Sequence, residues 1–284
     1  MTTTSPDNYA RPPLRRRLLA HPFARAVLAV LFVLVPFIGL MVLSEAVPKP
    51  YRAGWPMLLA ALGVVGGYRF YVRSFERRVV TELGLAGAGE ELRRGLGLGA
   101  LLVVFCSAVL LAAGAWTATG TAHWSVMFTP LPEQVMVAFM EEILFRAVIF
   151  RLLEKSWGTT IAFVVSSLLF ALAHVPNEGF SVFAAVMTAV ASATLTGAWL
   201  VTRRLWLPIG IHFAWNYLFD AVFSLPVSGH PGRGWIQIAT GGPDWLTGGA
   251  YGVEGSVVTL VGWGAAAVVL VAIARRRGQW LPQP

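Results

Sequence analysis

The sequence predicts an all-α fold, a polytopic membrane bundle of about eight transmembrane helices. Hydrophobic residues make up 56% of its 284 positions and charged residues only 13%, with a mean hydropathy of +0.67. Soluble domains carry about 25% charged residues, so a soluble fold is excluded. The apolar residues also gather in long runs separated by short polar stretches, which is the pattern of helices that cross a bilayer.

Each apolar run is long enough for about 20 helical residues, the number needed to cross a bilayer. The second run is short and rich in glycine, and the seventh has Pro208 near its start, where a helix tolerates proline. The eight runs lie at about 24–44, 53–71, 96–117, 131–152, 158–175, 180–201, 205–224 and 254–274. Two glycine clusters are expected to be close-packing points between helices, namely Gly63, Gly66 and Gly67, and Gly95, Gly97 and Gly99.

The basic residues indicate how the bundle is oriented. Of the 22 Lys and Arg residues, 18 flank the runs on one side, whereas Lys49, Arg52 and Arg233 fall on the other and Arg146 lies inside a run. The positive-inside rule then places both termini in the cytoplasm, in what we expect to be the plasma membrane. This placement also explains the net charge of +8, so we expect contacts with the lipid bilayer and no nucleic-acid partner. The expected domains are a disordered basic N-terminus at 1–22, a transmembrane domain at 23–275 with an extracytoplasmic loop at 225–252, and a cytoplasmic tail at 276–284.

Three charged residues within the fourth run are the strongest functional signal. Glu141, Glu142 and Arg146 stand among apolar residues, although a charge at the bilayer centre costs roughly 3 kcal/mol or more on insertion scales. Glu142 and Arg146 are four residues apart and share a helix face, so they can pair. Glu141 is rotated by about 100° from Glu142, which leaves it free to point into a cavity and act as a general base. The alternative is a structural lock, in which Arg146 pairs with a Glu between helices and the second Glu bonds to a neighbour.

Two further runs contribute imidazoles and an amide. His174 closes the fifth run, where a single His is more often an ordinary interfacial residue. His212 lies in the seventh run with Asn216 one turn later, so the two form either a polar packing contact or a pair aimed at one point. A carboxylate, imidazoles and an amide are the groups needed to activate water, and a Glu with two His is a known zinc-ligand set. The spacing does not give HExxH, so any metal or water site must be assembled across the bundle.

The ordered motifs EExxxR, FxxxH and HxxxN resemble the CAAX-protease and bacteriocin-processing family of intramembrane proteases, also called the Abi or type II CAAX prenyl endopeptidase family. The resemblance covers about residues 130–220, the expected catalytic core. It implies a helical membrane bundle with a catalytic cavity partly open to water, and cleavage of a peptide bond near the membrane. It assigns the water-activating pair to Glu141 and His174, the groups that polarise the scissile carbonyl or bind metal to His212 and Asn216, and the other charged positions to Glu142 and Arg146.

The leading interpretation is therefore a membrane-embedded endopeptidase, metal-dependent or glutamate-dependent, that acts on a peptide or protein substrate. If zinc is bound, Glu141, His174 and His212 are the expected ligands. The resemblance leaves open whether the substrate is prenylated or membrane-associated. Helix counting places Glu141 near mid-membrane, His174 near the outer end of its run and His212 nearer the inner end, so tilt, a broken helix or shifted boundaries must reconcile these depths.

Two alternative functions fit the same residues. Intramembrane Glu, Arg and His are equally natural in a proton-coupled transporter, but repeated halves and matching broken helices are not visible in the sequence. A non-catalytic immunity or assembly protein could use the same scaffold, because a fold alone does not fix a function.

Overall fold

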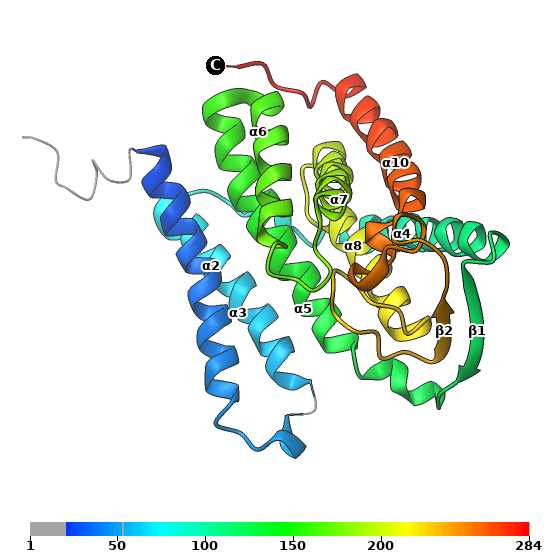
Figure 1. Ribbon diagram of the computed structural model, residues 1–284. Coiled ribbons are helices and arrows are strands. Elements are labelled where there is room, and N and C mark those ends of the chain that lie inside the picture. Colours follow the sequence, from blue (N-terminus) through cyan, green and yellow to red (C-terminus); the bar gives the residue numbers. More distant parts are fainter. Residues whose placement is uncertain (1–20, 53, 284) are drawn as a thin grey trace, which may run out of the picture.

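The computed structural model describes residues 21–52 and 54–283, so the expected disordered segment 1–22 lies almost wholly outside the described residues. The long helices, shown in Figure 1, are α2 (Pro22–Ser44), α3 (Trp55–Tyr71), α4 (Ala88–Ala112), α5 (Leu131–Glu142), α6 (Arg151–Ala173), α7 (Val182–Thr202), α8 (Trp206–Tyr217) and α10 (Val257–Arg276). The described part of the chain also has a short helix, α9 (Asp244–Thr247), two strands, β1 (Trp116–Thr121) and β2 (Ile236–Thr240), and several short 3-10 and π-helical segments. The fold is thus mostly helical, as the sequence predicts.

Each predicted run coincides with helical structure, but the third run ends differently from the prediction. Its helix, α4, starts eight residues before the predicted position and ends at Ala112, and Trp116–Thr121 forms strand β1 instead of continuing the helix. Gly114 adopts a φ of 69°, a left-handed conformation that ends the helix. Strand β1 then pairs antiparallel with β2 of the predicted loop 225–252. Hydropathy alone extends the run to residue 117 because alanine and tryptophan suit either structure.

Five helical segments are long and apolar enough to cross a membrane, which indicates an integral membrane protein. Four of them are the helices α2, α4, α7 and α10. The fifth is the continuous stretch Trp124–Ala173, which contains α5 and α6. Helices α3 and α8 are shorter, with 17 and 12 residues. The count of eight crossings therefore stays a prediction.

The stretch from α5 to α6 is not one regular helix. Between α5 and α6 the chain makes wide π-helical turns over Ile143–Phe150. Within α6, Gly158 has φ 74° and ψ 171°, so it breaks the helix at the start of the predicted fifth run. A side chain at Gly158 would meet the carbonyl oxygen of Pro282 at 2.7 Å, because the C-terminal segment packs against this break. The second part of α6 consequently starts close to a chain reversal and ends at the candidate site.

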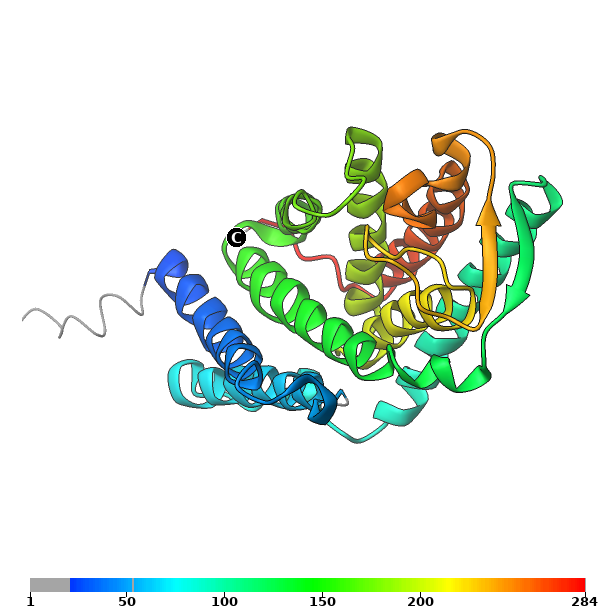
Figure 2. The same ribbon diagram turned by 60° about the horizontal axis from the view of Figure 1, so that its bottom comes forward.

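Helices α4 and α8 approach each other closely in the centre of the bundle. A Cβ at Gly95 would lie 2.3 Å from the carbonyl oxygen of Leu207, and one at Gly99 would lie 2.6 Å from that of Ile211. Figures 1 and 2 show α2 and α3 side by side along one edge of the molecule, and residues of both belong to one core cluster with residues of α5 to α8. Close packing is confirmed for the predicted points Gly63, Gly67, Gly95 and Gly99. A Cβ at Gly66 or Gly97 would have no atom of another element within 4 Å, so the prediction was wrong there.

Candidate active site

Four of the six predicted site residues line one polar pocket inside the bundle. Glu141 comes from the end of α5, His174 follows α6, and His212 and Asn216 lie on α8. The cavity has a volume of about 100 Å³, which is room for several water molecules. The structure therefore brings together a carboxylate, two imidazoles and an amide from three helices.

Glu142 makes two contacts with one of its carboxylate oxygens. Its Oε1 lies 3.1 Å from Nη1 of Arg146 and 2.8 Å from Nδ1 of His212. The side chains of Glu142 and Arg146 are both fully buried. The predicted pairing of Glu142 with Arg146 is thus confirmed, but the contact with His212 was not predicted. Glu142 joins α5 to α8 as well as neutralising Arg146.

Arg146 has further partners on two other helices. Its Nη2 donates to the carbonyl oxygen and to the hydroxyl of Ser192 on α7, both at 3.2 Å. The guanidinium also lies over the ring of Phe170 on α6, 4.8 Å from its centroid. A charge this deeply buried needs such compensation. Arg146 therefore ties α6 and α7 to the π-helical turns from which it projects, and it does not line the pocket.

Glu141 is the carboxylate that remains free. It lines the pocket, and its Oε2 is buried without a hydrogen-bond partner; Oε2 of Glu142 also has none, but that carboxylate is held by Arg146 and His212 through its other oxygen. The nearest cationic candidate is Nε2 of His212, at 3.8 Å from that oxygen. Buried carboxylate oxygens are usually satisfied, so an orphaned oxygen in a polar pocket indicates a place for water or a ligand.

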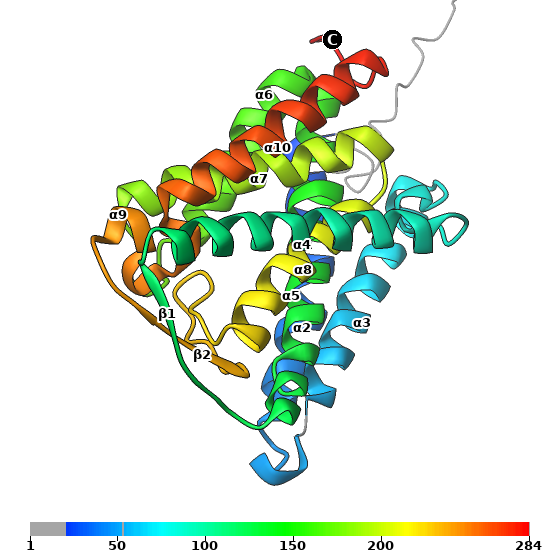
Figure 3. The same ribbon diagram turned by 90° about the vertical axis from the view of Figure 1, so that its right-hand side faces the viewer.

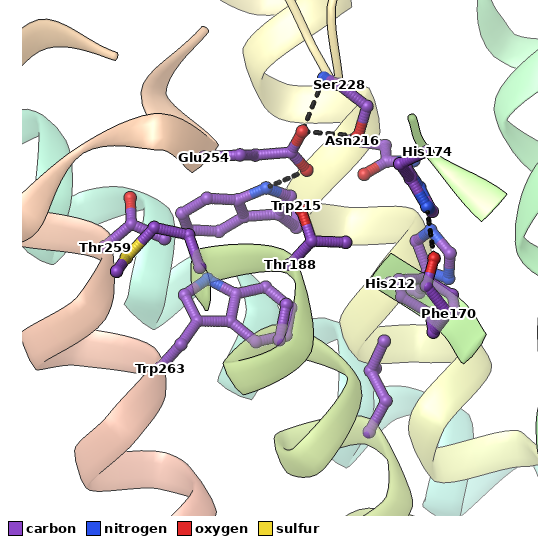
Figure 4. Close-up of a pocket in the computed structure, with 13 residues that line it drawn as sticks. Phe170, His174, Thr188, His212, Trp215, Asn216, Ser228, Glu254, Thr259 and Trp263 are labelled. Carbon is purple, nitrogen blue, oxygen red and sulfur yellow. Dashed lines mark hydrogen bonds between the residues drawn. The ribbon is translucent and has the colours of Figure 1, made fainter. Parts of the chain in front are cut away.

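Hydrogen bonds at the two imidazoles fix which nitrogen carries the proton. Nδ1 of His174 lies 2.8 Å from the carbonyl oxygen of Phe170, as Figure 4 shows. A carbonyl oxygen can only accept, so Nδ1 of His174 must donate and its Nε2 keeps a lone pair in the neutral ring. By the same argument, His212 donates Nδ1–H to the Glu142 carboxylate. Each ring then presents Nε2 as the group available for chemistry.

Short helices explain how Glu141, His174 and His212 can lie at one depth in the membrane, although helix counting in the sequence places them at different depths. The part of α6 after Gly158 has 15 residues, Thr159–Ala173, which span about 22 Å. A bilayer core is about 30 Å thick, so the end of this part can lie inside it. His174 at this end thus reaches the level of Glu141, and His212 comes within 3.8 Å of Glu141 from the middle of the helical stretch Trp206–Val222.

Polar residues near the pocket were missed by sequence reasoning. Glu254 accepts a hydrogen bond from Nε1 of Trp215 at 3.0 Å and is also hydrogen-bonded to Ser228, as Figure 4 shows. Asp220 lies one turn beyond Asn216 and lines the same pocket. The spacing 212, 216, 220 continues a polar stripe at i, i+4 and i+8, and this signal could have identified Asp220 from the sequence. Nothing in the local sequence indicates that Glu254 folds back onto α8.

The fold and the pocket define a helical membrane protein with an internal polar site. Residues 123–218 match the family model described as type II CAAX prenyl endopeptidase Rce1-like. This segment is therefore a domain of the CAAX-protease and bacteriocin-processing family, and it contains all six predicted site residues. The family implies an intramembrane protease with a peptide substrate. Comparison with curated proteins and comparison with solved structures each found no match.

Proposed function

We propose that this protein is a membrane-embedded endopeptidase that hydrolyses a peptide bond with water held between Glu141 and His174. The observation that supports this most is the orphaned Oε2 of Glu141 in a pocket of about 100 Å³ that His174 also lines. An unpaired carboxylate and an imidazole with a free Nε2 that line one small pocket can together orient and deprotonate one water molecule.

The reaction would follow the geometry of these two groups. Glu141 accepts a proton from the water while Nε2 of His174 accepts its other hydrogen in a hydrogen bond. The resulting hydroxide attacks the peptide carbonyl, and the tetrahedral intermediate collapses as Glu141 returns the proton to the leaving amine. A positioned general base of this kind contributes roughly 10²–10⁴-fold to a rate.

Asn216 is the group best suited to stabilise the oxyanion. Its amide can donate a hydrogen bond into the pocket that it lines, and one such donor is typically worth about 10²–10³-fold in kcat. His212 can join it only as an imidazolium, because Nδ1–H already donates to Glu142 and neutral Nε2 cannot donate. If His212 polarises the scissile carbonyl, it would therefore have to act in its protonated form.

Zinc fits the donor chemistry of the pocket. Metal-binding histidines commonly donate their second N–H to a carbonyl or a carboxylate, as His174 and His212 do toward Phe170 and Glu142. Within the described residues, no group of three or more His, Cys, Asp or Glu side chains is already arranged to hold a metal ion. Zinc, if bound, would be held by Glu141, His174 and His212, and it would supply a lowered pKa for its water.

The proposal is tested with the full chain purified in detergent and a set of quenched fluorescent peptides. Glu141→Gln should lose at least 100-fold in kcat/KM. Glu133→Gln is the matched control, because Glu133 lies on the same helix and lines the same pocket but pairs with Arg233. Equal loss in both variants, or turnover by Glu141→Gln like that of wild type, would contradict the mechanism. Metal analysis of wild type beside His174→Ala decides whether zinc takes part.

A further inference from the structure

The polar pocket extends toward only one end of the bundle. On α5 its lining residues run from Glu141 back to Glu133 near the start of the helix. On α8 and the π-helical turns that follow it, they run from His212 forward to Asp220, close to the end of the helical stretch at Val222. Both directions lead to the end that carries β1, β2 and α9, which Figure 3 shows together on one side of the molecule.

The mouth of the pocket is the part of its lining at this end of the bundle, and one ordered segment of the chain forms it. Val227, Ser228, His230 and Arg233, from the segment between α8 and β2, line it. Arg233 donates to Asp220 and to Glu133, each at 2.7 Å, so it joins this segment to both helices. The mouth residue His230 is exposed.

The opposite end of the bundle is basic and is held together by ion pairs. Arg151 at the start of α6 lies 2.7 Å from Glu76 beyond α3. Arg203 after α7 donates to Glu154 at 3.1 Å. The C-terminal ends of α3 and α7 and the start of α6 therefore meet there. Figure 3 shows the C-terminal end of α10 on the same side.

The distribution of cations distinguishes the two ends. Apart from Lys49, Arg52, Arg233 and the buried Arg146, every Lys and Arg of the described chain flanks the helices at the basic end. An excess of Lys and Arg marks the cytoplasmic side of a membrane protein. The other end carries a two-stranded ribbon with exposed residues and open edges, and such edges are not found in hydrocarbon. The ribbon must therefore lie in water or at the interface.

We infer that the pocket opens on the extracytoplasmic side of the membrane and takes a peptide segment exposed there, not a cytoplasmic C-terminus. The side of the opening follows from the placement of the mouth and of the cations. The substrate class rests in addition on the proposed endopeptidase function. The basic end lies on the far side of the bundle from the residues that line the mouth, so a substrate in the cytoplasm would have to cross the bundle, whereas one outside meets these residues first.

Cysteine labelling tests the side of the opening without any assay of activity. The chain has a single cysteine, Cys106, which is buried, so Cys106→Ala gives a cysteine-free background. His230→Cys reports the mouth, and Arg276→Cys, at an exposed position in the last turn of α10, is the matched control for the basic end. On intact spheroplasts a membrane-impermeant maleimide should label position 230 at least fivefold more than position 276. After lysis the maleimide should label both positions. Thr117→Cys on β1 repeats the test should His230→Cys fold poorly.

Labelling of position 276 but not of 230 or 117 on intact spheroplasts would overturn the inference. The substrate side is then tested in proteoliposomes, with orientation measured by the same labels and with a cleavable peptide added only outside. Turnover should follow the fraction of molecules whose position 230 is accessible, and turnover that follows position 276 would also overturn it. If the peptide is cleaved neither in proteoliposomes nor in detergent, the proposed endopeptidase function is refuted. The labelling would still decide on which side of the membrane the pocket opens.

Discussion

Replacing Glu142 by Gln should separate the stability of the bundle from its chemistry. In the wild type one oxygen of Glu142 contacts both Arg146 and His212, at 3.1 and 2.8 Å. The substitution keeps the shape of the side chain and removes its charge. Arg146, which is fully buried, is then left without its counter-ion.

The size of the effect follows from the surroundings of Arg146. Removing one partner of a buried ion pair costs roughly 3–5 kcal/mol in soluble proteins. Arg146 keeps its bonds to Ser192 and its contact with the ring of Phe170, so we expect the lower end, about 3 kcal/mol. At roughly 2–4 °C per kcal/mol for a chain of this size, the melting temperature should fall by roughly 6–12 °C. Glu142→Gln with Arg146→Met should recover at least half of this loss, because no lone charge remains buried.

Activity should not recover in the double variant. The Gln oxygen can still accept from Nδ1 of His212, but without a charge, and loss of such a supporting partner typically costs about 10–100-fold in activity. The assay is a thermal melt in detergent beside peptide cleavage for the wild type, Glu142→Gln, the double variant and Glu141→Gln. Glu141→Gln should melt at or above the wild-type temperature, because it removes an unpaired buried carboxylate. A stable but inactive Glu142→Gln beside an early-melting Glu141→Gln would show that the roles of the two glutamates are reversed.

Two further predictions concern regions outside the pocket. Burial raises the pKa of Glu82, but hydrogen bonds from Arg78 and Tyr68 outweigh it and lower this pKa from 4.5 to about 2. The stabilisation is therefore complete above about pH 4.5 and is lost as the pH falls toward 2, so wild type and Glu82→Gln should converge in melting temperature over that window, and a constant difference would refute the assignment. Gly95→Ala should lower the melting temperature because its Cβ would lie 2.3 Å from a carbonyl oxygen of α8, whereas Gly97→Ala, with open space around it, should be neutral or stabilising by up to about 1 kcal/mol. Equal melting of these two variants would contradict the packing of α4 on α8.

The sequence predicts those parts of the site that depend on geometry within one helix. Glu142 and Arg146 pair because a helix places residues four apart on one face. Glu141 is left free for the same reason. The contact between Glu142 and His212 joins residues 70 positions apart, so it depends on how α5 packs against α8, and no periodicity encodes that packing.

The errors of the sequence prediction have equally local causes. Hydropathy marks where a chain is apolar, but it does not distinguish the end of α4 from strand β1, because Gly114 ends the helix by its backbone conformation. Gly97 is like its neighbours Gly95 and Gly99 in sequence, yet it faces open space because it lies on another side of α4. The depth of His174 depends on the break at Gly158, which has a φ of 74° and lies against the C-terminal segment, so a contact between distant parts of the chain accompanies the break.

The central claim is that Glu141 and His174 act together on one water molecule, and a double-mutant cycle tests it most directly. The kcat/KM for a cleaved peptide is measured for wild type, Glu141→Gln, His174→Ala and the double variant, each shown to be folded by its melt. Groups that act as a unit are non-additive, so each single variant should lose at least 100-fold and the double variant should be little worse than either. Losses that multiply in the double variant, or wild-type turnover in Glu141→Gln, would contradict the account.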